Sequence, residues 1–250
     1  MIMANEVTVV MINAFRPDNV RKLIEHYAAM PLVSRVIVAD VAANYSNTTE
    51  VSGSWLKLPE KLMWLRIHPD PGMYLRFTAA TLAQTSAVLI VDDDIMVPAH
   101  TVRMLFTHWQ SAPEVLHGLV GRNPDIDIPD GYTIDKAYGD VQIVLTRCVM
   151  MSAGYLGPVL DISRRIVPVL PGEPGGNGED IVLSYVAMRE SRFFNKVHKL
   201  PYEDMDAKSP VSISVRFAAH LEQRKAVLKW CRLNLVMPSK IKKLIDAVHP

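Results

Sequence analysis

The residues of this chain best suited to chemistry are three consecutive carboxylates, Asp92-Asp93-Asp94. They directly follow residues 87–91 (AVLIV), an apolar run with the length and β-branched content of a buried strand. Adjacent carboxylates repel one another and resist burial, and a divalent cation such as Mg²⁺ or Mn²⁺ is the simplest partner that would hold them together. The alternative is a solvated acidic turn after a core strand. The apolar run favours the metal, and because ligands of open α/β sheets bind beyond the carboxyl ends of strands, we expect a site for a metal and a diphosphate there.

A second candidate is the acidic pair Glu179-Asp180, which follows the Gly- and Pro-rich segment 170–178 (LPGEPGGNG). Glycines let such a loop close over a ligand, so it could deliver one carboxylate into a cleft while Asn177 donates from its side-chain amide. The alternative is an ordinary helix start, whose first-turn carboxylates complement the helix dipole.

Several arginines are placed to contact an anionic ligand. Arg16 follows the first expected strand, at the carboxyl edge of the sheet, and Arg76 precedes the acidic strand by one helix. Arg216, His220 and Arg224 recur every four residues and therefore share one helix face. That face could clamp the charge that develops on a departing diphosphate. The alternative for each of these residues is a solvated surface position.

The other histidines and aromatic residues are interpreted as structural. His198 and His220 are conceivable metal ligands, but a lone histidine is usually a packing residue. Trp55, Trp64 and Trp109 fit a core better than a sugar-stacking platform.

Strands and helices alternate along the first half of the chain. This order, with short connections, predicts a mostly parallel sheet wrapped by helices. The expected strands are 7–12, 36–39, 63–67 and 87–91, and the expected helices are 17–31, 73–85 and 98–110. In the less regular second half we expect strands at 117–122 and 141–146, and helices starting at 179 and spanning 215–235.

Length and composition indicate an ordinary globular protein. The chain has 250 residues, 49% hydrophobic and 21% charged, and a net charge of +1, which gives no argument for nucleic-acid binding. Its two cysteines, Cys148 and Cys231, make no disulfide framework and favour a reducing compartment. The first ten residues (MIMANEVTVV) lack the pattern of a signal peptide, and no run of 18 apolar residues predicts a transmembrane helix.

No linker divides the chain, so we expect a single domain. Residues 6–122 would form a nucleotide-binding half, residues 123–235 an acceptor-binding half, and residues 236–250 a basic tail. The mixed apolar and basic residues from Trp230 to Lys243 could touch a membrane surface, although a terminal helix with a solvated tail explains them as well.

A set of spaced motifs resembles the exostosin-like glycosyltransferases, glycosyltransferase family 64. The resemblance runs from about residue 6 to about residue 235, and its most specific part is the combination of the triple Asp with the Asn-x-Glu-Asp-Ile segment. The matching segments are 14–18 (AFRPD) after the first strand, 26–27 (HY), 36–38 (VIV), 87–94 (AVLIVDDD) and 177–181 (NGEDI).

This resemblance implies a GT-A fold, a Rossmann-like mixed sheet flanked by helices. It also implies a UDP-sugar donor bound through Mn²⁺ or Mg²⁺, and transfer of the sugar with retention. By the same resemblance, Asp92 and Asp94 form the DxD pair, with Asp94 the best metal ligand. Asp93 helps to hold the nucleotide, Arg16 lies near the uracil, and Arg76 matches the arginine in the helix before the acidic strand.

For the catalytic residues, the resemblance implies that Asp180 faces the donor sugar, with Glu179 and Asn177 beside it. Arg216 matches, loosely, an arginine near the diphosphate. Asp180 would position the sugar or stabilise positive charge at the anomeric carbon, and a covalent role stays open.

Some residues depart from the family pattern. Animal members have a disulfide-bonded cysteine where this chain has Gly178, and an asparagine pair where it has Asp40-Val41-Ala42. These differences, with no signal anchor, predict a soluble cytoplasmic protein, peripheral at the inner face of the membrane if the basic tail binds it. From the resemblance we expect the acceptor to be a carbohydrate, a glycolipid or a small molecule, and the donor sugar to be an N-acetylhexosamine or a related hexose.

Three other functions compete with this one. A sugar nucleotidyltransferase needs a Gly-rich phosphate loop after the first strand, where this chain has residues 13–17 (NAFRP). A haloacid-dehalogenase-type phosphatase has its Asp-x-Asp after the first strand, not after the fourth. A non-catalytic UDP-sugar-binding protein on the same fold would have little reason to keep both acidic motifs.

Overall fold

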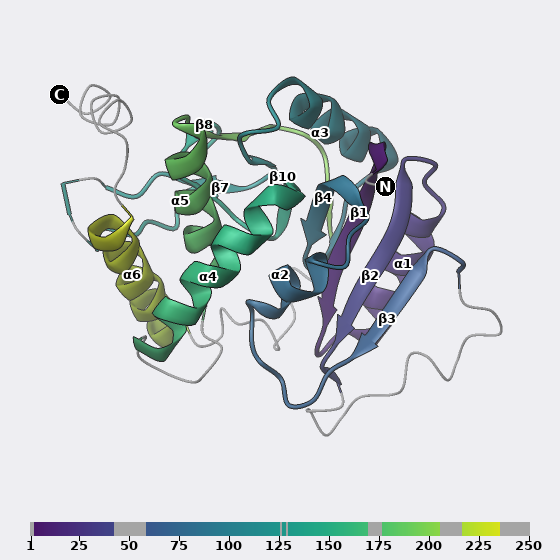
Figure 1. Cartoon of the computed structure of the whole chain (residues 1–250), viewed down its shortest axis with the longest axis horizontal. Helices are drawn as coiled ribbons and strands as arrows, with labels where there is room; N and C mark the ends of the chain where they lie inside the picture. Colours follow the sequence, from purple (N-terminus) through teal and green to yellow (C-terminus); the bar gives the residue numbers. More distant parts are fainter. Residues whose placement is uncertain are drawn as a thin grey trace.

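A mixed sheet is the centre of the fold (Figure 1). The computed structural model describes residues 3–42, 59–125, 127–128, 130–169, 177–205 and 217–235. Within these residues, eight strands form the main sheet in the order β3-β2-β1-β4-β10-β6-β11-β8. The sheet therefore includes strands from both halves of the chain.

The first four strands of this sheet are parallel, as predicted. Their apolar runs form β1 (Met3–Asn13), β2 (Val33–Asp40), β3 (Leu62–Arg66) and β4 (Thr85–Val91). The connecting helices are α1 (Pro17–Ala28) and α2 (Leu75–Ala80). Parallel pairing places the carboxyl ends of all four strands at one edge, which is the edge where the triple Asp emerges.

The helix expected over residues 73–85 is shorter than predicted. It ends at Ala80, and Thr85 already belongs to β4. The Thr85 hydroxyl donates to the Ala87 carbonyl (2.7 Å) and contacts the Thr8 hydroxyl (2.8 Å), which ties this residue to the sheet. Tertiary pairing thus overrides the local preference for helix.

The second half contains elements that the sequence did not predict. Strand β10 (Cys148–Ser152) inserts between β4 and β6, antiparallel to both, and α4 (Leu156–Ile166) follows it. The strand expected at 117–122 is two short strands, β6 (His117–Gly118) and β7 (Gly121–Arg122), in different sheets.

The remaining short strands belong either to the main sheet or to two small two-stranded sheets. The strand expected at 141–146 is likewise divided between the main sheet and a two-stranded sheet shared with β7. These strands are β5 (Ile95–Met96), β8 (Gly139–Val141), β9 (Ile143–Val144), β11 (Asn195–Val197) and β12 (Glu203–Asp204).

Helices cover both faces of the sheet (Figure 1). Along β4, Leu89 and Val91 point into a core with α1 and α3 (Ala99–Ser111), whereas Val88 and Ile90 point into a core with α2 and α4. The helices α5 (Glu179–Ser191) and α6 (Phe217–Asn234) join this second core.

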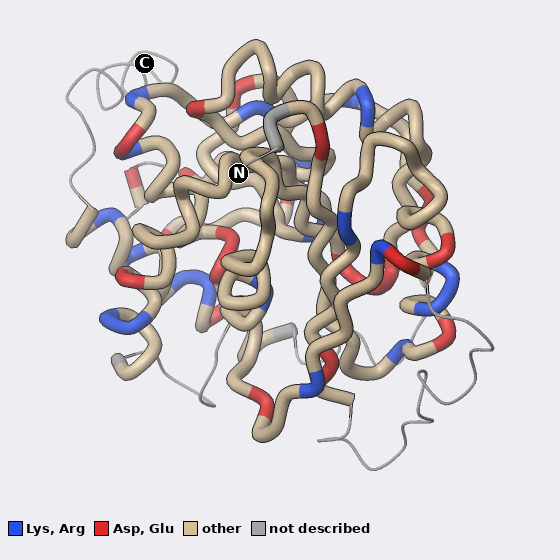
Figure 2. The backbone as a smooth tube through the Cα atoms, turned by 45° about the vertical axis from the view of Figure 1, so that its right-hand side comes forward, with Lys and Arg blue, Asp and Glu red and all other residues tan. Residues whose placement is uncertain are grey.

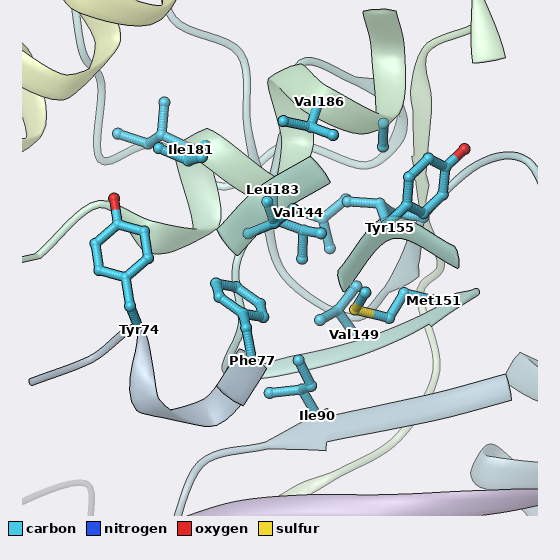
Figure 3. Close-up of a cluster of buried hydrophobic side chains, with 14 of the residues drawn as sticks. Tyr74, Phe77, Ile90, Val144, Val149, Met151, Tyr155, Ile181, Leu183 and Val186 are labelled. Carbon is cyan, nitrogen blue, oxygen red and sulfur yellow. The ribbon is translucent and has the colours of Figure 1, made fainter. Parts of the chain in front are cut away.

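Helix α5 is buried along most of its length. Every residue from Glu179 to Met188 is buried, which agrees with the apolar composition of this segment. Figure 3 shows Tyr74 and Phe77 facing Ile181 and Leu183 across this core. The packing fixes the position of the acidic pair at the start of α5, because the helix cannot shift without opening the core.

Charge and thiols agree with the sequence prediction. Figure 2 shows acidic and basic residues interspersed along the chain, whose net charge is +1. Cys148 and Cys231 are both free and buried. Among the described helices, none combines the length and the apolar character needed to cross a bilayer.

Candidate active site

Each of the three consecutive aspartates after β4 has its own arginine. Arg16, from the β1–α1 connection, lies 2.8 Å from Asp93. Arg76, from α2, lies 2.8 Å from Asp92. The third arginine is described with Asp94 below. The structure therefore brings together Arg16, Arg76 and the triple Asp, which the sequence placed at the same edge of the sheet.

Burial and mutual repulsion oppose the simultaneous ionisation of Asp92, Asp93 and Asp94, unless positive charge beyond that of the arginines is present. Burial, reinforced by Asp92 and Asp94 and opposed by Arg16, raises the pKa of Asp93 to about 7. Burial and the neighbouring Asp92 also raise the pKa of Asp94. The cluster thus gains stability from any additional cation that binds it.

Asp94 is paired with Arg147, which the sequence analysis missed. Arg147 Nε lies 3.5 Å from Asp94 Oδ1, and Arg147 Nη2 donates to Asp204 at 2.6 Å. Arg147 immediately precedes β10, the strand that was not predicted. No sequence signal marked it, because its approach to Asp94 depends on the antiparallel pairing of β10 with β4.

Glu179 connects the start of α5 to the triple Asp. Its carboxylate accepts from the Thr146 hydroxyl (2.7 Å) and the Gly178 amide (3.1 Å) and lies 3.7 Å from Arg76 Nε. Arg76 thereby joins Asp92 to Glu179. Although burial opposes its charge, these two carboxylates raise the pKa of Arg76, which keeps the guanidinium ionised.

Asp180 is held on both of its oxygens. Oδ1 accepts from the Ile181 amide (2.8 Å), and Oδ2 accepts from Arg224 (2.5 Å). The residue is 2% exposed. Arg224 also donates to Asn177 (2.9 Å) and lies over the Tyr132 ring, 4.6 Å from its centroid. Arg224, predicted on the late helix face, and Asp180, predicted after the Gly-rich segment, thus form one buried unit.

His220 and Asn177 complete this unit. The Asn177 amide contacts His220 Nδ1. Burial and the adjacent Arg224 lower the pKa of His220. Arg216, predicted to contact the diphosphate, lies outside the described residues, as do residues 170–176 and the basic tail at 236–250.

Gly178 allows the close approach of α5 and α6. Its φ of 102° lies in the left-handed region, and an added Cβ would lie 2.8 Å from the Val227 side chain. A cysteine side chain at this position, as in animal relatives, would require Val227 to move.

We expect Gly178→Ala to lower the free energy of unfolding by about 2–3 kcal/mol, through backbone strain and overpacking. Urea denaturation would measure the change. Gly157→Ala on α4 is the matched control, because an added Cβ there meets nothing within 4 Å. Equal stability of the two variants would contradict the role given to Gly178.

The end of β2 carries a hydrogen-bond network in place of the family's asparagine pair. The Asp40 carboxylate accepts from Asn13 (2.8 Å), from the Trp64 indole (3.0 Å) and from the Ala42 amide (3.1 Å). Asn13 was not singled out from the sequence, and Trp64, interpreted as a packing residue, also donates to Asp40. This network ties the ends of β1 and β2 to β3.

The charges and polar atoms of the site suit a divalent cation. Among the described residues, six carboxylates (Asp92, Asp93, Asp94, Glu179, Asp180 and Asp204) form ion pairs with four guanidinium groups. Asp94 Oδ1 is buried and accepts no hydrogen bond. Among the described residues, no group of three or more His, Cys, Asp or Glu side chains is arranged to hold an ion. A cation at Asp94 would therefore need oxygen ligands from a substrate or water.

His198 belongs to a separate stack of three histidines. Its ring lies 4.0 Å from that of His108, and its Nε2 lies 3.1 Å from His117 Nδ1. Burial and the neighbouring histidines lower the pKa of His198 to about 4. The described geometry thus gives His198 a packing role.

Comparison with known proteins agrees with the family resemblance of the two acidic motifs. Residues 7–238 match the Glycosyl transferase family 64 domain. Exostosin-like 2 of Mus musculus is 32% identical over 126 residues, which are 46% of this chain and 34% of that protein. Glycosyltransferase family protein 64 C3 of Arabidopsis thaliana is 32% identical over 120 residues, 45% of this chain and 35% of that protein. The chain spans about a third of the length of these relatives.

Two further similarities extend over most of the chain. Glucosamine inositolphosphorylceramide transferase 1 of Arabidopsis thaliana is 23% identical over 218 residues, 84% of this chain and 28% of that protein. The solved structure of mannosyltransferase PcManGT from Pyrobaculum calidifontis, in complex with GDP-Man and Mn²⁺, superposes with a TM-score of 0.63 at 16% identity. The superposition covers 98% of this chain and 69% of that one, and it confirms the predicted fold.

Proposed function

Because this chain belongs to glycosyltransferase family 64, we propose that it transfers a sugar from a nucleotide-sugar donor to an acceptor hydroxyl. The proposed donor is a UDP-sugar carrying an N-acetylhexosamine or a related hexose, and the proposed transfer retains the anomeric configuration. One observation carries the proposal. Arg76 lies within 2.8 Å of Asp92 and 3.7 Å of Glu179, so a single buried cation joins the two acidic motifs.

The proposed donor site lies at the carboxyl ends of β1, β2 and β4. Asp92 and Asp94 would hold Mn²⁺ or Mg²⁺, and Asp93 and Arg16 would contact the nucleoside. The cation, when bound, would supply Lewis-acid stabilisation of the charge on the departing nucleotide. Arg76 is buried, permanently charged and already oriented, so it adds electrostatic stabilisation at little cost in reorganisation.

The contacts of Asp180 favour a positioning role over a nucleophilic one. Its two oxygens accept hydrogen bonds from Ile181 and Arg224, and the bond to Arg224 is charge-assisted. A carboxylate engaged in this way is a weak nucleophile, but its charge can still stabilise an oxocarbenium-like centre nearby. We therefore propose same-face attack, in which the departing phosphate accepts the proton of the acceptor hydroxyl.

The acceptor is proposed by class only. A carbohydrate, a glycolipid and a small molecule each provide the required hydroxyl. The name of one plant relative, a glucosamine inositolphosphorylceramide transferase, makes a glycolipid worth testing first. Arg216 stays a prediction for the diphosphate contact.

The proposal is tested by nucleotide release from a panel of donors, with and without Mn²⁺ and without an acceptor. The panel comprises UDP-N-acetylglucosamine, UDP-N-acetylgalactosamine, UDP-glucuronic acid, UDP-glucose and GDP-mannose. We expect slow, Mn²⁺-dependent release from one UDP-sugar, because transferases often hydrolyse their own donor. Metal-dependent UDP binding by calorimetry without any release would favour a binding protein. Neither release nor binding would contradict the proposal, and release from GDP-mannose alone would correct the donor.

A further inference from the structure

Arg147 is held beside Asp94 without making a hydrogen bond to it. Its Nε lies 3.5 Å from Asp94 Oδ1, and that buried oxygen accepts no hydrogen bond. Its Nη2, in contrast, donates to Asp204 at 2.6 Å. The guanidinium thus directs its short, charge-assisted bond at Asp204 and leaves Asp94 Oδ1 without a donor.

The backbone fixes this geometry on both sides. Asp204 pairs with Ile95 in the β12–β5 ladder, and the Met205 amide donates to the Asp94 carbonyl at 2.8 Å. Arg147 is fixed in turn because its carbonyl accepts from the Asp92 amide at 3.0 Å. The backbones of Asp204, Arg147 and Asp94 are therefore held together by main-chain bonds, which do not depend on the side-chain charges.

We infer that Asp204 is a positioning residue that holds Arg147 away from Asp94 and so keeps Asp94 Oδ1 open for a divalent cation. The inference rests on the metal role given to Asp94 in the proposed function. Without Asp204, the Arg147 guanidinium keeps its contact with the Tyr202 ring, 5.8 Å from the ring centroid, but loses its bond to a carboxylate. A small turn would then let it donate to Asp94, because only 3.5 Å separates them. A guanidinium bonded to that oxygen would compete with the cation, and its uncompensated charge would repel the cation.

The Asp204 carboxylate also favours cation binding in a second way. It balances the charge of Arg147, so a cation at Asp94 meets a neutral pair and not a lone guanidinium. Arg147 and Asp204 are only partly buried, with side-chain exposures of 24% and 34%, so solvent screens this second effect. Competition between the Arg147 guanidinium and the cation for Asp94 Oδ1 is therefore the larger of the two effects.

The test is a titration of the whole chain with Mn²⁺, in which the free ion is measured by electron paramagnetic resonance. We expect Asp204→Asn to weaken Mn²⁺ binding about tenfold, a change of about 1.4 kcal/mol. Arg147→Met should bind Mn²⁺ at least as tightly as the wild type. The double variant should regain the affinity of Arg147→Met, because the competing guanidinium is gone. Glu203→Gln is the matched control, since it removes one carboxylate from the neighbouring position of the same exposed strand.

The outcomes separate this inference from the proposed function. A double variant as weak as Asp204→Asn would mean that Asp204 itself ligates the ion, and a weak Arg147→Met would mean that Arg147 supports the site. Either result overturns the inference and leaves the proposed function standing. No Mn²⁺ binding by the wild type would overturn the metal role and the inference together. If thermal unfolding shows that Asp204→Asn does not fold, Arg147→Met still tests the inference. Weaker Mn²⁺ binding by Arg147→Met than by the wild type would overturn it.

Discussion

Asp94→Ala is expected to lower metal-dependent nucleotide release by at least about a hundredfold, which corresponds to about 2.7 kcal/mol of transition-state stabilisation. Asp94 has the one oxygen among the three aspartates that is both buried and without a hydrogen bond. Its removal takes away the expected metal ligand and leaves Arg147 beside an empty position. The measurement is the initial rate of UDP release at matched Mn²⁺ concentrations, with the donor identified from the panel.

Two controls keep the result for Asp94 specific. Asp161→Ala removes an exposed carboxylate from α4, far along the chain from the site, and should leave the rate unchanged. Thermal unfolding should show that Asp94→Ala is folded, because burial raises the pKa of Asp94 and its ionised form contributes little to stability without a cation. Wild-type activity of Asp94→Ala at matched metal would make the metal assignment wrong.

Arg224→Met is expected to lower the free energy of unfolding by about 3–5 kcal/mol, the usual cost of leaving one charge of a buried pair alone. Arg224 and Asp180 are 5% and 2% exposed, and 2.5 Å separates their bonded atoms. Although burial opposes its charge, Asp180 raises the pKa of Arg224, so the variant removes a permanently charged group. Urea denaturation at neutral pH measures the loss.

A second variant distinguishes loss of the charge pair from loss of packing. Asp180→Asn combined with Arg224→Met should regain at least about half of the lost stability, because no buried charge is then left unpaired. Lys229→Met is the control on the same helix, since Lys229 is exposed. If the double variant is no more stable than Arg224→Met, packing and not charge pairing explains the role of Arg224.

Much of the site was predictable because its main elements are local in sequence. Apolar runs with β-branched residues identify β1, β2 and β4, and the triple Asp is directly attached to the end of β4. In a parallel sheet, the carboxyl ends of the strands must meet at one edge. The order of residues along the chain is therefore enough to place Arg16 and the triple Asp at the same edge. Only the structure shows that β1 and β4 are neighbours, which brings the two together.

The position of the second acidic motif, Glu179-Asp180, at a helix start was predictable, but its contacts were not. The change from a Gly-rich segment to an apolar run marked the start of α5 at Glu179. The sequence left open whether Asp180 faces a sugar freely or is already engaged. The structure shows it bonded to Arg224, because α6 packs against α5 at Gly178, where a side chain would not fit.

By itself, then, the sequence determined the fold class, the family and the two acidic motifs, since these depend on local hydrophobic patterns and on residue type. Only the tertiary structure decided which arginine meets which carboxylate. Arg147 reaches Asp94 because β10 runs antiparallel to β4, and Arg224 reaches Asp180 because two helices pack closely. Long, flexible arginine side chains have many partners within reach in an unfolded chain, and the packing of distant elements selects one of them.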